Sequence, residues 1–477
     1  MEHTEYRTEL NDLLSSTANS IRMTDGKVEV ANQDELRNNI HKLVDASVLQ
    51  SGAKQGYARY LIRSAAQSMG IIPASIHDLY MARGRGELAP TFTVPAMNLR
   101  ALSYDAARAV FRAAKKLDAG AFIFEIARSE MGYTDQRPAE YACNVLAAAI
   151  AEGYTGPVFI QGDHFQVSAK RYASDPETEL QTIRELIVEA MHAGFFNIDI
   201  DSSTLVDLSK ADIKEQQAVN TALSAMFTAF IRKHEPQGVT VSVGGEIGEV
   251  GGQNSTEPEL RGYMNGYNEE LNKLGPGITG ISKISIQTGT SHGGVVLPDG
   301  SIASVNVDFD TLRHLSRIAR EDYGLGGAVQ HGASTLPESA FGKFVESEAI
   351  EVHLATNFMN MMYDRIPEEL KADVYRHLDE KNASERKPDM TNEQFYYKTR
   401  KSALGTFKRQ LWEMPVEYRE RIREAWEAQF DKMFKLLGLE GTRRAVEQTV
   451  QPPVIKPNLK FYLGEETGEA DVSDLAD

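Results

Sequence analysis

The sequence is poor in cysteine. Cys143 is the only cysteine among the 477 residues, so no disulfide can form within the chain and a zinc cluster built from several cysteines is excluded. A metal site in this protein must therefore draw its ligands from histidine, aspartate and glutamate.

Positive charge and long hydrophobic runs are also scarce. Lys and Arg number 51 against 68 Asp and Glu, a formal net charge of −17, which repels nucleic-acid backbones and anionic lipids. No stretch approaches the ~18 consecutive apolar residues of a membrane span, and the first residues lack the apolar core of a signal peptide. We therefore expect a cytoplasmic protein with no nucleic acid and no membrane as partner.

Short β-rich runs alternate with helical stretches through the middle of the chain. The eight runs are 91–98, 121–126, 157–164, 196–201, 239–246, 281–292, 327–331 and 349–356. Such alternation with right-handed crossovers implies a parallel sheet, and eight repeats predict closure into a (β/α)₈ TIM barrel of the α/β class. An open doubly wound sheet is the alternative, which the absence of G-x-G-x-x-G after the first run disfavours.

Helical segments flank the predicted barrel on both sides. We divide the chain into an N-terminal helical extension (1–75), the barrel (76–365), a C-terminal helical extension (366–460) and an acidic, disordered tail (461–477). Because the two extensions exceed what a barrel needs, we expect them to bury surface in a homodimer or homotetramer. The alternative is that they cover the bottom of their own barrel.

Polar residues cluster where the predicted strands end. These ends carry Asn98, Glu125, Asp163, His164, Asp201, Glu246, His292, His331, Thr356 and Asn357. In such barrels the carboxyl ends of the strands form the active-site face. Three imidazoles around one Zn²⁺ with an open fourth position is the recurrent catalytic pattern, which His164, His292 and His331 fit.

Asp163 precedes His164 directly and suits a general acid–base. Because neighbours on a strand face opposite ways, a bend or bulge must turn both side chains toward the site. A lone histidine at a strand end is more often structural, but three on one rim favour a metal site. Asp201 also fits a turn, Glu246 also fits a salt bridge, and His353 reads as a core histidine.

The order of these motifs resembles one family. The matching segments are Val94-Pro95-Ala96-Met97-Asn98, Gly162-Asp163-His164, Ile200-Asp201-Ser202-Ser203, Glu246-Ile247-Gly248, Gly251-Gly252-Gln253, Gly289-Thr290-Ser291-His292-Gly293 and His331-Gly332. Over roughly residues 75–440 the chain resembles the class II, metal-dependent ketose-bisphosphate aldolases, which include the zinc-dependent fructose-bisphosphate aldolases.

The resemblance implies a role for each matching residue. His164, His292 and His331 would hold a catalytic zinc, Asp163 would be the acid–base, and Glu246 and Asp201 would support this metal or a second one. The implied substrate-binding residues are Asn98, Gly293, Gly332, Ser334, Thr356 and Asn357. Three imidazoles also accept Co²⁺, Fe²⁺ or Mn²⁺, and a second divalent or a monovalent cation is an open alternative.

The implied reaction is the reversible aldol cleavage of a ketose 1,6-bisphosphate. Fructose 1,6-bisphosphate, a glycolytic sugar phosphate, would give dihydroxyacetone phosphate and glyceraldehyde 3-phosphate through an enediolate that zinc stabilises. The chain would then be a carbon–carbon lyase, an aldehyde-lyase with a sugar phosphate as its small-molecule partner.

The phosphate loops depart from the family pattern. The family's Gly-Gly-Ser/Thr-Gly after the third histidine is Gly332-Ala333-Ser334-Thr335 here, and its strand-eight Asn is His353. Asn254 stands where a mobile loop usually carries a proton-transferring Glu, which Glu249 or Glu257 would have to replace. These changes leave the substrate open between fructose, tagatose and other sugar phosphates.

A second resemblance concerns Glu125 and the segment Gly132-Tyr133-Thr134. Together with Gly162-Asp163-His164 they are similar to the large subunits of tagatose-bisphosphate aldolases, which implies an accessory, non-catalytic subunit as an alternative. A sugar-phosphate sensor on the same barrel is a further alternative. The retained histidine triad argues for an enzyme.

Overall fold

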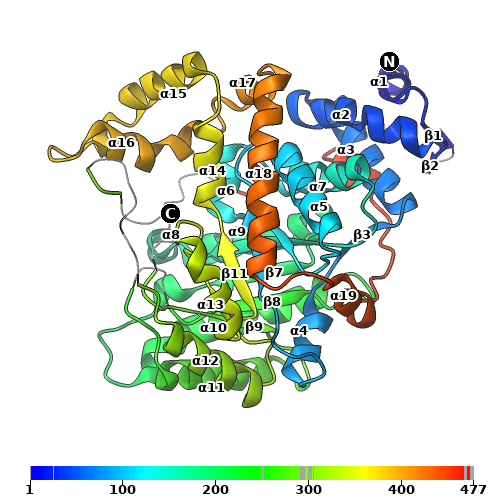
Figure 1. Cartoon of the computed structure of the whole chain (residues 1–477). Helices are drawn as coiled ribbons and strands as arrows, with labels where there is room; N and C mark the ends of the chain where they lie inside the picture. The colour runs from blue at the N-terminus through cyan, green and yellow to red at the C-terminus, as the bar shows by residue number, and fades with distance from the viewer. Residues whose placement is uncertain are drawn as a thin grey trace.

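A closed parallel barrel forms the centre of the molecule (Figure 1). The structure is a computed structural model that describes residues 2–24, 26–248, 252–290, 296–298, 303, 306–466 and 470–472. Within these residues eight parallel strands close through pairing of the last strand with the first. They are β4 (Val94–Asn98), β5 (Ile123–Ala127), β6 (Gly156–Gln166), β7 (Asn197–Asp201), β8 (Ser242–Glu246), β9 (Lys283–Ile286), β10 (Ala328–Gln330) and β11 (Glu351–Leu354). The predicted TIM barrel is confirmed.

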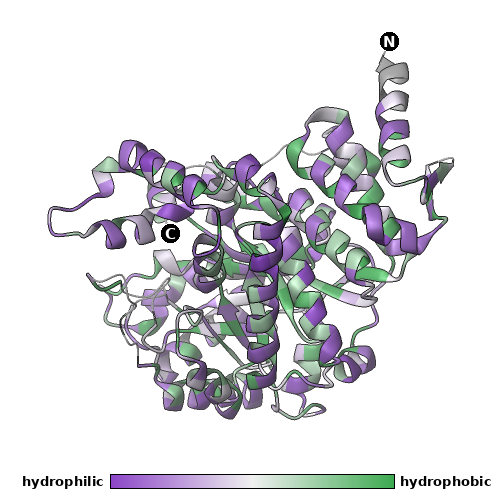
Figure 2. Cartoon of the chain, turned by 45° about the horizontal axis from the view of Figure 1, so that its top comes forward, coloured by the Kyte–Doolittle hydropathy of each residue, from purple (hydrophilic) through white to green (hydrophobic). Residues whose placement is uncertain are grey.

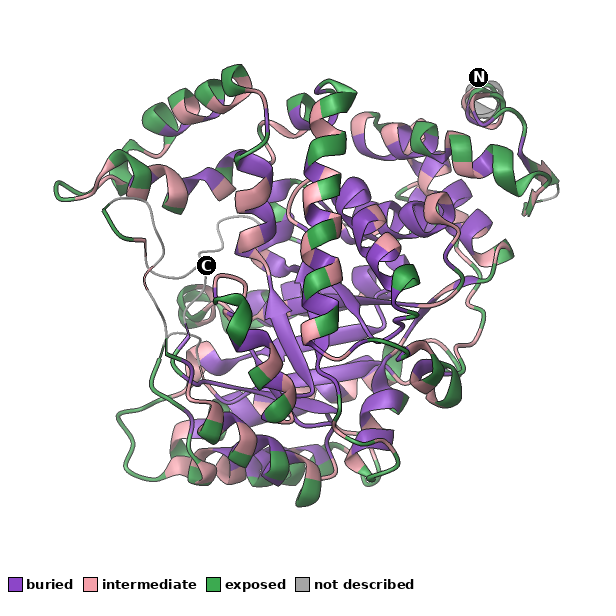
Figure 3. Cartoon of the chain, viewed as in Figure 1, coloured by how far each residue is buried: buried purple, intermediate pink, exposed green. Residues whose placement is uncertain are grey.

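Helices surround the barrel and pack their apolar faces on it. They are α4 (His77–Gly84), α5 (Ser103–Lys116), α6 (Arg128–Thr134), α7 (Pro138–Glu152), α8 (Ala169–Ser174), α9 (Pro176–Ala193), α10 (Ile213–His234), α11 (Glu257–Leu274), α12 (Phe309–Glu321) and α13 (Phe341–Glu346). Figure 3 shows the strands buried and the outer faces of these helices exposed, and in Figure 2 the outward faces are largely hydrophilic. Two residues set the ends of helix α7: Pro138 is its first residue, and Gly153, with a left-handed backbone at φ +63°, ends it.

The N-terminal segment adds a ninth strand to the sheet. It contains α1 (Glu2–Ser16), β1 (Ile21–Thr24), β2 (Lys27–Val30), α2 (Gln33–Leu49), α3 (Gly52–Ser68) and β3 (Ile71–Ala74). Strand β3 pairs with the first half of one edge of β6, and β7 pairs with the second half. The Asn197 amide ties β3 to the barrel, because it donates to the carbonyls of Ala74 and Ile160. Helices α2 and α3 pack against α7.

The C-terminal helices extend from the barrel rim along one side. They are α14 (Thr356–Tyr363), α15 (Glu368–Lys381), α16 (Asn392–Thr399), the 3₁₀ turn η4 (Arg400–Ala403), α17 (Lys408–Trp412), α18 (Val416–Leu436), α19 (Arg443–Thr449) and α20 (Leu459–Tyr462). Figure 1 shows α15 and α16 projecting together beside α14. Helix α18 packs along α5, where Arg419 and Arg423 form ion pairs with the buried Asp105.

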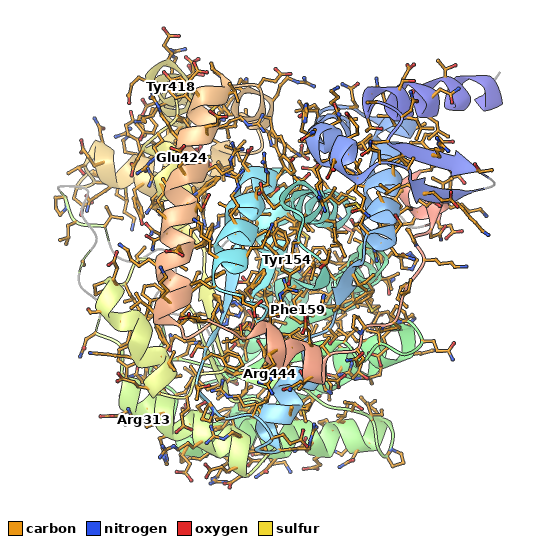
Figure 4. All side chains as sticks on the ribbon, turned by 45° about the vertical axis from the view of Figure 1, so that its right-hand side comes forward. Tyr154, Phe159, Arg313, Tyr418, Glu424 and Arg444 are labelled. Carbon is orange, nitrogen blue, oxygen red and sulfur yellow. The ribbon has the colours of Figure 1, made fainter. Side chains whose placement is uncertain are left out.

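Helices α18 and α19 contact the barrel wall through long side chains. Figure 4 labels Tyr418 and Glu424 on α18, Phe159 on β6 and Tyr154 just before β6. The guanidinium of Arg443 lies 4.8 Å from the Tyr154 ring centroid. Among the described residues, no helix is long and apolar enough to cross a bilayer.

The described part of the segment predicted as a tail is packed on the molecule. Phe461 and Tyr462 are buried in α20, which contacts α3. Further on, Asp471 forms an ion pair with Arg171 at 3.1 Å, and Val472 is buried. The chain therefore returns to the barrel near α6 and α8.

Candidate active site

A bulge at the end of β6 directs two neighbouring side chains to the same place. The pairing of β6 with β7 shifts register between Gly162 and Phe165, and His164 has a left-handed backbone, φ +40°. The bulge that the sequence requires is present, so Asp163 and His164 both line one cavity. Gly162 has no room for a side chain, because a Cβ there would meet the Phe165 ring at 2.3 Å.

Two imidazoles face each other at the barrel rim. The distance from Nε2 of His164 to Nδ1 of His331 is 2.9 Å, and the ring centroids are 4.4 Å apart. The opposite nitrogen of each ring is held, since His164 Nδ1 lies 2.9 Å from Glu246 Oε1 and His331 Nε2 lies 2.9 Å from Ser285 Oγ. Metal-ligating histidines usually have this second nitrogen hydrogen-bonded, so the two rings are oriented as metal ligands would be.

Glu246 and Asp201 lie behind His164 and are both buried. Asp201 Oδ2 is 3.2 Å from His164 Nδ1, and Asp201 also accepts hydrogen bonds from Ser203 and Gln166. Burial opposes the charge on His164, but Asp163, Glu246 and Asp201 raise its pKa well above the usual value. Burial likewise raises the pKa of Glu246 to about 7, although His164 acts against this rise.

Asp163 is buried beside the histidine pair. Its Oδ1 lies 3.6 Å from His164 Nε2 and 3.1 Å from His353 Nδ1, and its Oδ2 accepts a hydrogen bond of 2.9 Å from the Asn98 amide. Burial alone would raise the pKa of Asp163, but the charges of His164 and His353 hold it well below its usual range. Asp163 is therefore a carboxylate at neutral pH.

The donor set suits a divalent metal. Ligand atoms of Asp163, His164 and His331 all lie within 4.8 Å of one another, as do those of His164, Asp201 and Glu246. Two imidazole nitrogens on a tetrahedral zinc stand about 3.3 Å apart, close to the spacing found here. Glu246 Oε2 is buried and has no hydrogen-bond partner among the described residues, so a nearby cation would offset its negative charge.

A cavity of about 1270 Å³ opens above these groups. Its walls come from the barrel rim and from the C-terminal segment around α16 and η4. Cationic side chains that line it are Arg100, Arg128, Lys387, Lys398 and Lys401. The same lining carries the acidic side chains Glu130, Asp163, Asp201, Glu385 and Asp389, and Arg100 and Arg128 form ion pairs with Glu130 and Glu179.

The predicted substrate-binding residues have different positions. Gly332, Ser334 and Thr356 line the cavity, and Thr356 accepts a hydrogen bond from Arg100. Asn98 lines it too, but its amide already donates to Glu130 and Asp163. Asn357 is not among the lining residues.

Three of the predicted positions lie outside the described residues: His292, Gly293 and Glu249. Of the other loop candidates, Glu257 pairs with Arg261 and His314 at the start of α11, away from the cavity lining. Asn254 donates a long hydrogen bond, 3.4 Å, to Asp308.

The sequence reasoning did not bring together a second polar cluster inside the barrel, although it had named Glu125 at a strand end and read His353 as a core histidine. The cluster consists of Glu125, Gln161, Asp199, Lys283, Glu351 and His353, all buried. The signal was available: Glu351 and His353 alternate with Val352 and Leu354, which places both polar side chains on one face of β11. The same alternation places Asp199 on the face of β7 that carries Asp201.

Comparison with protein-family models assigns the chain to a family. The model of the class-II fructose-bisphosphate aldolase family matches residues 89–442, well over half of the chain, so the chain belongs to this family and the predicted resemblance is confirmed. Members are generally zinc-dependent, and membership supports a carbon–carbon lyase. No curated protein sequence matches the chain.

Solved structures show the same fold at low identity. A fructuronate-tagaturonate epimerase, UxaE, from Cohnella laeviribosi is 13% identical, with a TM-score of 0.53 and coverage of 88% of this chain and 90% of that one. A probable tagatose 6 phosphate kinase from Sinorhizobium meliloti 1021 is 15% identical, with a TM-score of 0.50 and coverage of 78% and 97%. A fructose-bisphosphate aldolase from Campylobacter jejuni is 17% identical, with a TM-score of 0.44 and coverage of 78% and 97%.

Proposed function

We propose that this protein is a metal-dependent aldolase that reversibly cleaves a ketose 1,6-bisphosphate, with fructose 1,6-bisphosphate as the first candidate. The products would be dihydroxyacetone phosphate and glyceraldehyde 3-phosphate. The observation that carries the proposal is the pair of facing nitrogens of His164 and His331, 2.9 Å apart, beside the buried carboxylate of Asp163.

His164, His331 and, by family resemblance, His292 would hold the metal. A bound divalent cation supplies a Lewis acid for the ketone oxygen, where negative charge develops as the carbon–carbon bond breaks. Glu246, Asp201 and Ser285 orient the two described rings from behind. These contacts keep the ligand nitrogens directed at the cavity, as hydrogen-bonded carboxylates do in other metal sites.

Asp163 would move the proton. In the cleavage direction the Asp163 carboxylate accepts the proton of the C4 hydroxyl and the C3–C4 bond breaks. The electron pair of that bond passes toward the C2 carbonyl. In the condensation direction the Asp163 acid returns the proton to the aldehyde oxygen. Asp163 is ionised at neutral pH, so it can accept a proton in the cleavage direction.

Basic side chains of the cavity lining would receive the phosphates. Arg100 lies on the rim after β4, and Lys398 and Lys401 reach the cavity from α16 and η4. Gly332 has a left-handed backbone, φ +68°, at the start of the altered phosphate loop, and Ser334 adds a hydroxyl. Gly293, Asn98 and Asn357 stay predictions as substrate contacts.

A second candidate is the epimerisation of a ketose or ketose acid at C4. The altered loop Gly332-Ala333-Ser334-Thr335, with Ala333 fully buried, supports a substrate other than a bisphosphate. The neighbour from Cohnella laeviribosi is named for such a reaction. The same chemistry suffices, since C3–C4 cleavage followed by addition to the other face of the aldehyde inverts C4. An accessory subunit of a tagatose-bisphosphate aldolase is disfavoured by the preserved metal-type site.

Aldol cleavage of fructose and tagatose 1,6-bisphosphates before and after chelation tests the proposal. We expect triose phosphate release that stops on metal removal and returns with Zn²⁺. Activity that survives complete metal removal would contradict the mechanism. Incubation with fructuronate or tagaturonate, followed by NMR of the sugar, tests the second candidate: the appearance of the C4 epimer without triose release would favour it.

The homodimer or homotetramer is part of the same proposal. It rests on the two helical extensions, residues 1–75 with α1–α3 and residues 366–460 with α15–α19, which the barrel itself does not require. Light scattering of the full chain is the measurement, and a mass equal to one chain would overturn this part.

A further inference from the structure

The polar cluster beneath the metal-type site carries a charge that the proposed reaction does not use. The ammonium of Lys283 is buried at the start of β9 and contacts Gln161 Oε1 at 2.7 Å, Asp199 Oδ2 at 2.9 Å and the Glu351 carboxylate. Tyr80 donates a hydrogen bond to Glu351 from outside the barrel. Lys283 thus neutralises part of the acidic interior and fixes Glu351 in place.

His353 connects this cluster to the acid–base. Its Nε2 lies 2.6 Å from Glu351 Oε1, and its Nδ1 lies 3.1 Å from Asp163 Oδ1 and 3.2 Å from Glu125 Oε1. The ring is 4% exposed. With a carboxylate oxygen at each nitrogen, both N–H groups donate. Burial opposes this charge, but Glu125 and Asp163 raise the pKa of His353 well above its usual value.

Asp163 is held at both oxygens. His353 binds Oδ1 while the Asn98 amide binds Oδ2 at 2.9 Å, and Asn98 itself is held by Glu130 at 2.8 Å. Two donors on opposite oxygens prevent the carboxylate from rotating about its Cβ–Cγ bond. Without His353 only the Asn98 contact would remain on Oδ2, and Oδ1 could turn toward His164, 3.6 Å away.

We propose that His353 is a positioning residue for Asp163: it holds the carboxylate at the angle needed to meet the C4 hydroxyl, and Glu351 with Lys283 holds His353. This inference rests on the proposed aldolase function. A displacement of about 1 Å at a reacting group can cost about 10²-fold in rate. The competing role is that of a metal ligand, because Glu125, Asp163 and His353 also bring ligand atoms within 4.8 Å of one another.

Two amide substitutions test separately what each ring nitrogen of His353 contributes. The amide nitrogen of Asn falls near the place of Nδ1, so His353→Asn keeps a donor toward Asp163. The amide nitrogen of Gln falls near the place of Nε2, so His353→Gln keeps the donor toward Glu351 and loses the one toward Asp163. We expect kcat to fall by about 10²-fold in His353→Gln and by less than about tenfold in His353→Asn, with KM within about threefold of wild type in both.

Metal content and thermal melting accompany the kinetics. Both variants should retain the full metal content and melt cooperatively, and rates are compared per metal-loaded, folded protein. His314→Asn, on an exposed histidine of α12 far from the cavity lining, is the matched control and should keep wild-type kcat.

Each outcome of these measurements tests either the positioning role of His353 or the proposed function. Equal kcat in the Asn and Gln variants would overturn the positioning role, and loss of metal in either would make His353 a ligand instead. A wild-type protein that cleaves no ketose phosphate would overturn the proposed function and this inference with it. Wild-type cleavage with equal variants would overturn the inference alone.

Discussion

Two regions of the barrel contain histidines and carboxylates but use them differently: the rim around His164 and His331, and the floor. The floor is the buried cluster of Glu125, Gln161, Asp199, Lys283, Glu351 and His353. At the rim, His164 and His331 present facing nitrogens to a cavity, and Glu246 and Asp201 hold one of them from behind. On the floor, the carboxylates Asp199 and Glu351 surround the Lys283 ammonium, and these three residues do not line the rim cavity. A buried charge cluster that contains its own cation is structural, whereas one that leaves acceptor atoms directed at a cavity can bind a metal.

The first prediction concerns the removal of one imidazole from the rim. His331→Ala removes one of the two facing nitrogens, so the metal should be lost and cleavage should fall by about 10³-fold or more, the rate equivalent of several kcal/mol of Lewis-acid stabilisation. Metal analysis and triose release measure it. Full metal content in this variant would refute the ligand assignment.

The second prediction separates the metal from the acid–base. Asp163→Asn keeps the size of the side chain and its contact with Asn98 but cannot accept the proton. We expect bound metal to stay at the wild-type level while kcat falls by about 10²- to 10⁴-fold. Wild-type turnover in this variant would remove Asp163 from the reaction.

The third prediction tests the floor. Lys283→Met leaves Asp199 and Glu351 buried without their cation, which should lower the free energy of unfolding by about 3–5 kcal/mol. The double variant Lys283→Met with Glu351→Gln restores part of this loss because one of the two charges disappears. Denaturant unfolding gives both values, and an unchanged stability in the single variant would show that Lys283 is not structural.

The fourth prediction compares two buried histidines. His353 sits among carboxylates, whereas burial lowers the pKa of His77 to about 4, with Arg232 and Arg85 acting in the same direction. The unfolded chain binds this proton near pH 6.5, so the stability that a neutral His77 contributes is full above pH 6.5 and is lost as the pH falls toward 4. The loss should reach at most about 3 kcal/mol.

Melting curves of wild type and His77→Asn between pH 7 and 4 isolate this effect. The variant should lose less stability over this range than the wild type. Equal slopes would show that folding does not lower the pKa of His77.

The sequence predicted the elements that follow a local periodic pattern, and it missed an element that depends on contacts with distant residues. The run 157–164 corresponds to β6, because strand periodicity is local. Strand β3 escaped notice because Ile71–Ala74 is short and is stabilised by pairing with β6, more than 80 residues further along the chain. The run 281–292 was too long, since β9 ends at Ile286.

The candidate site divides in the same way. The polar residues at strand ends identified the rim, and the adjacency of Asp163 and His164 correctly required a bulge. His353 read as a core histidine because its partner Asp163 lies on β6, which only the closed sheet brings close to β11, although Glu351 stands two residues away on the same strand. Asn98 was predicted to contact the substrate. In the fold its amide nitrogen donates hydrogen bonds to Asp163 and Glu130.

The amino-acid order by itself determined the alternation of strands and helices, the set of polar residues at the strand ends, and membership of the aldolase family. These properties depend on neighbours a few positions apart or on motif order. Only barrel closure decided which imidazole nitrogens face the cavity, which carboxylates stand behind them, and how the floor neutralises its own charge. The reason is that hydrogen-bond partners inside a barrel come from different strands, and their pairing exists only once the sheet has closed.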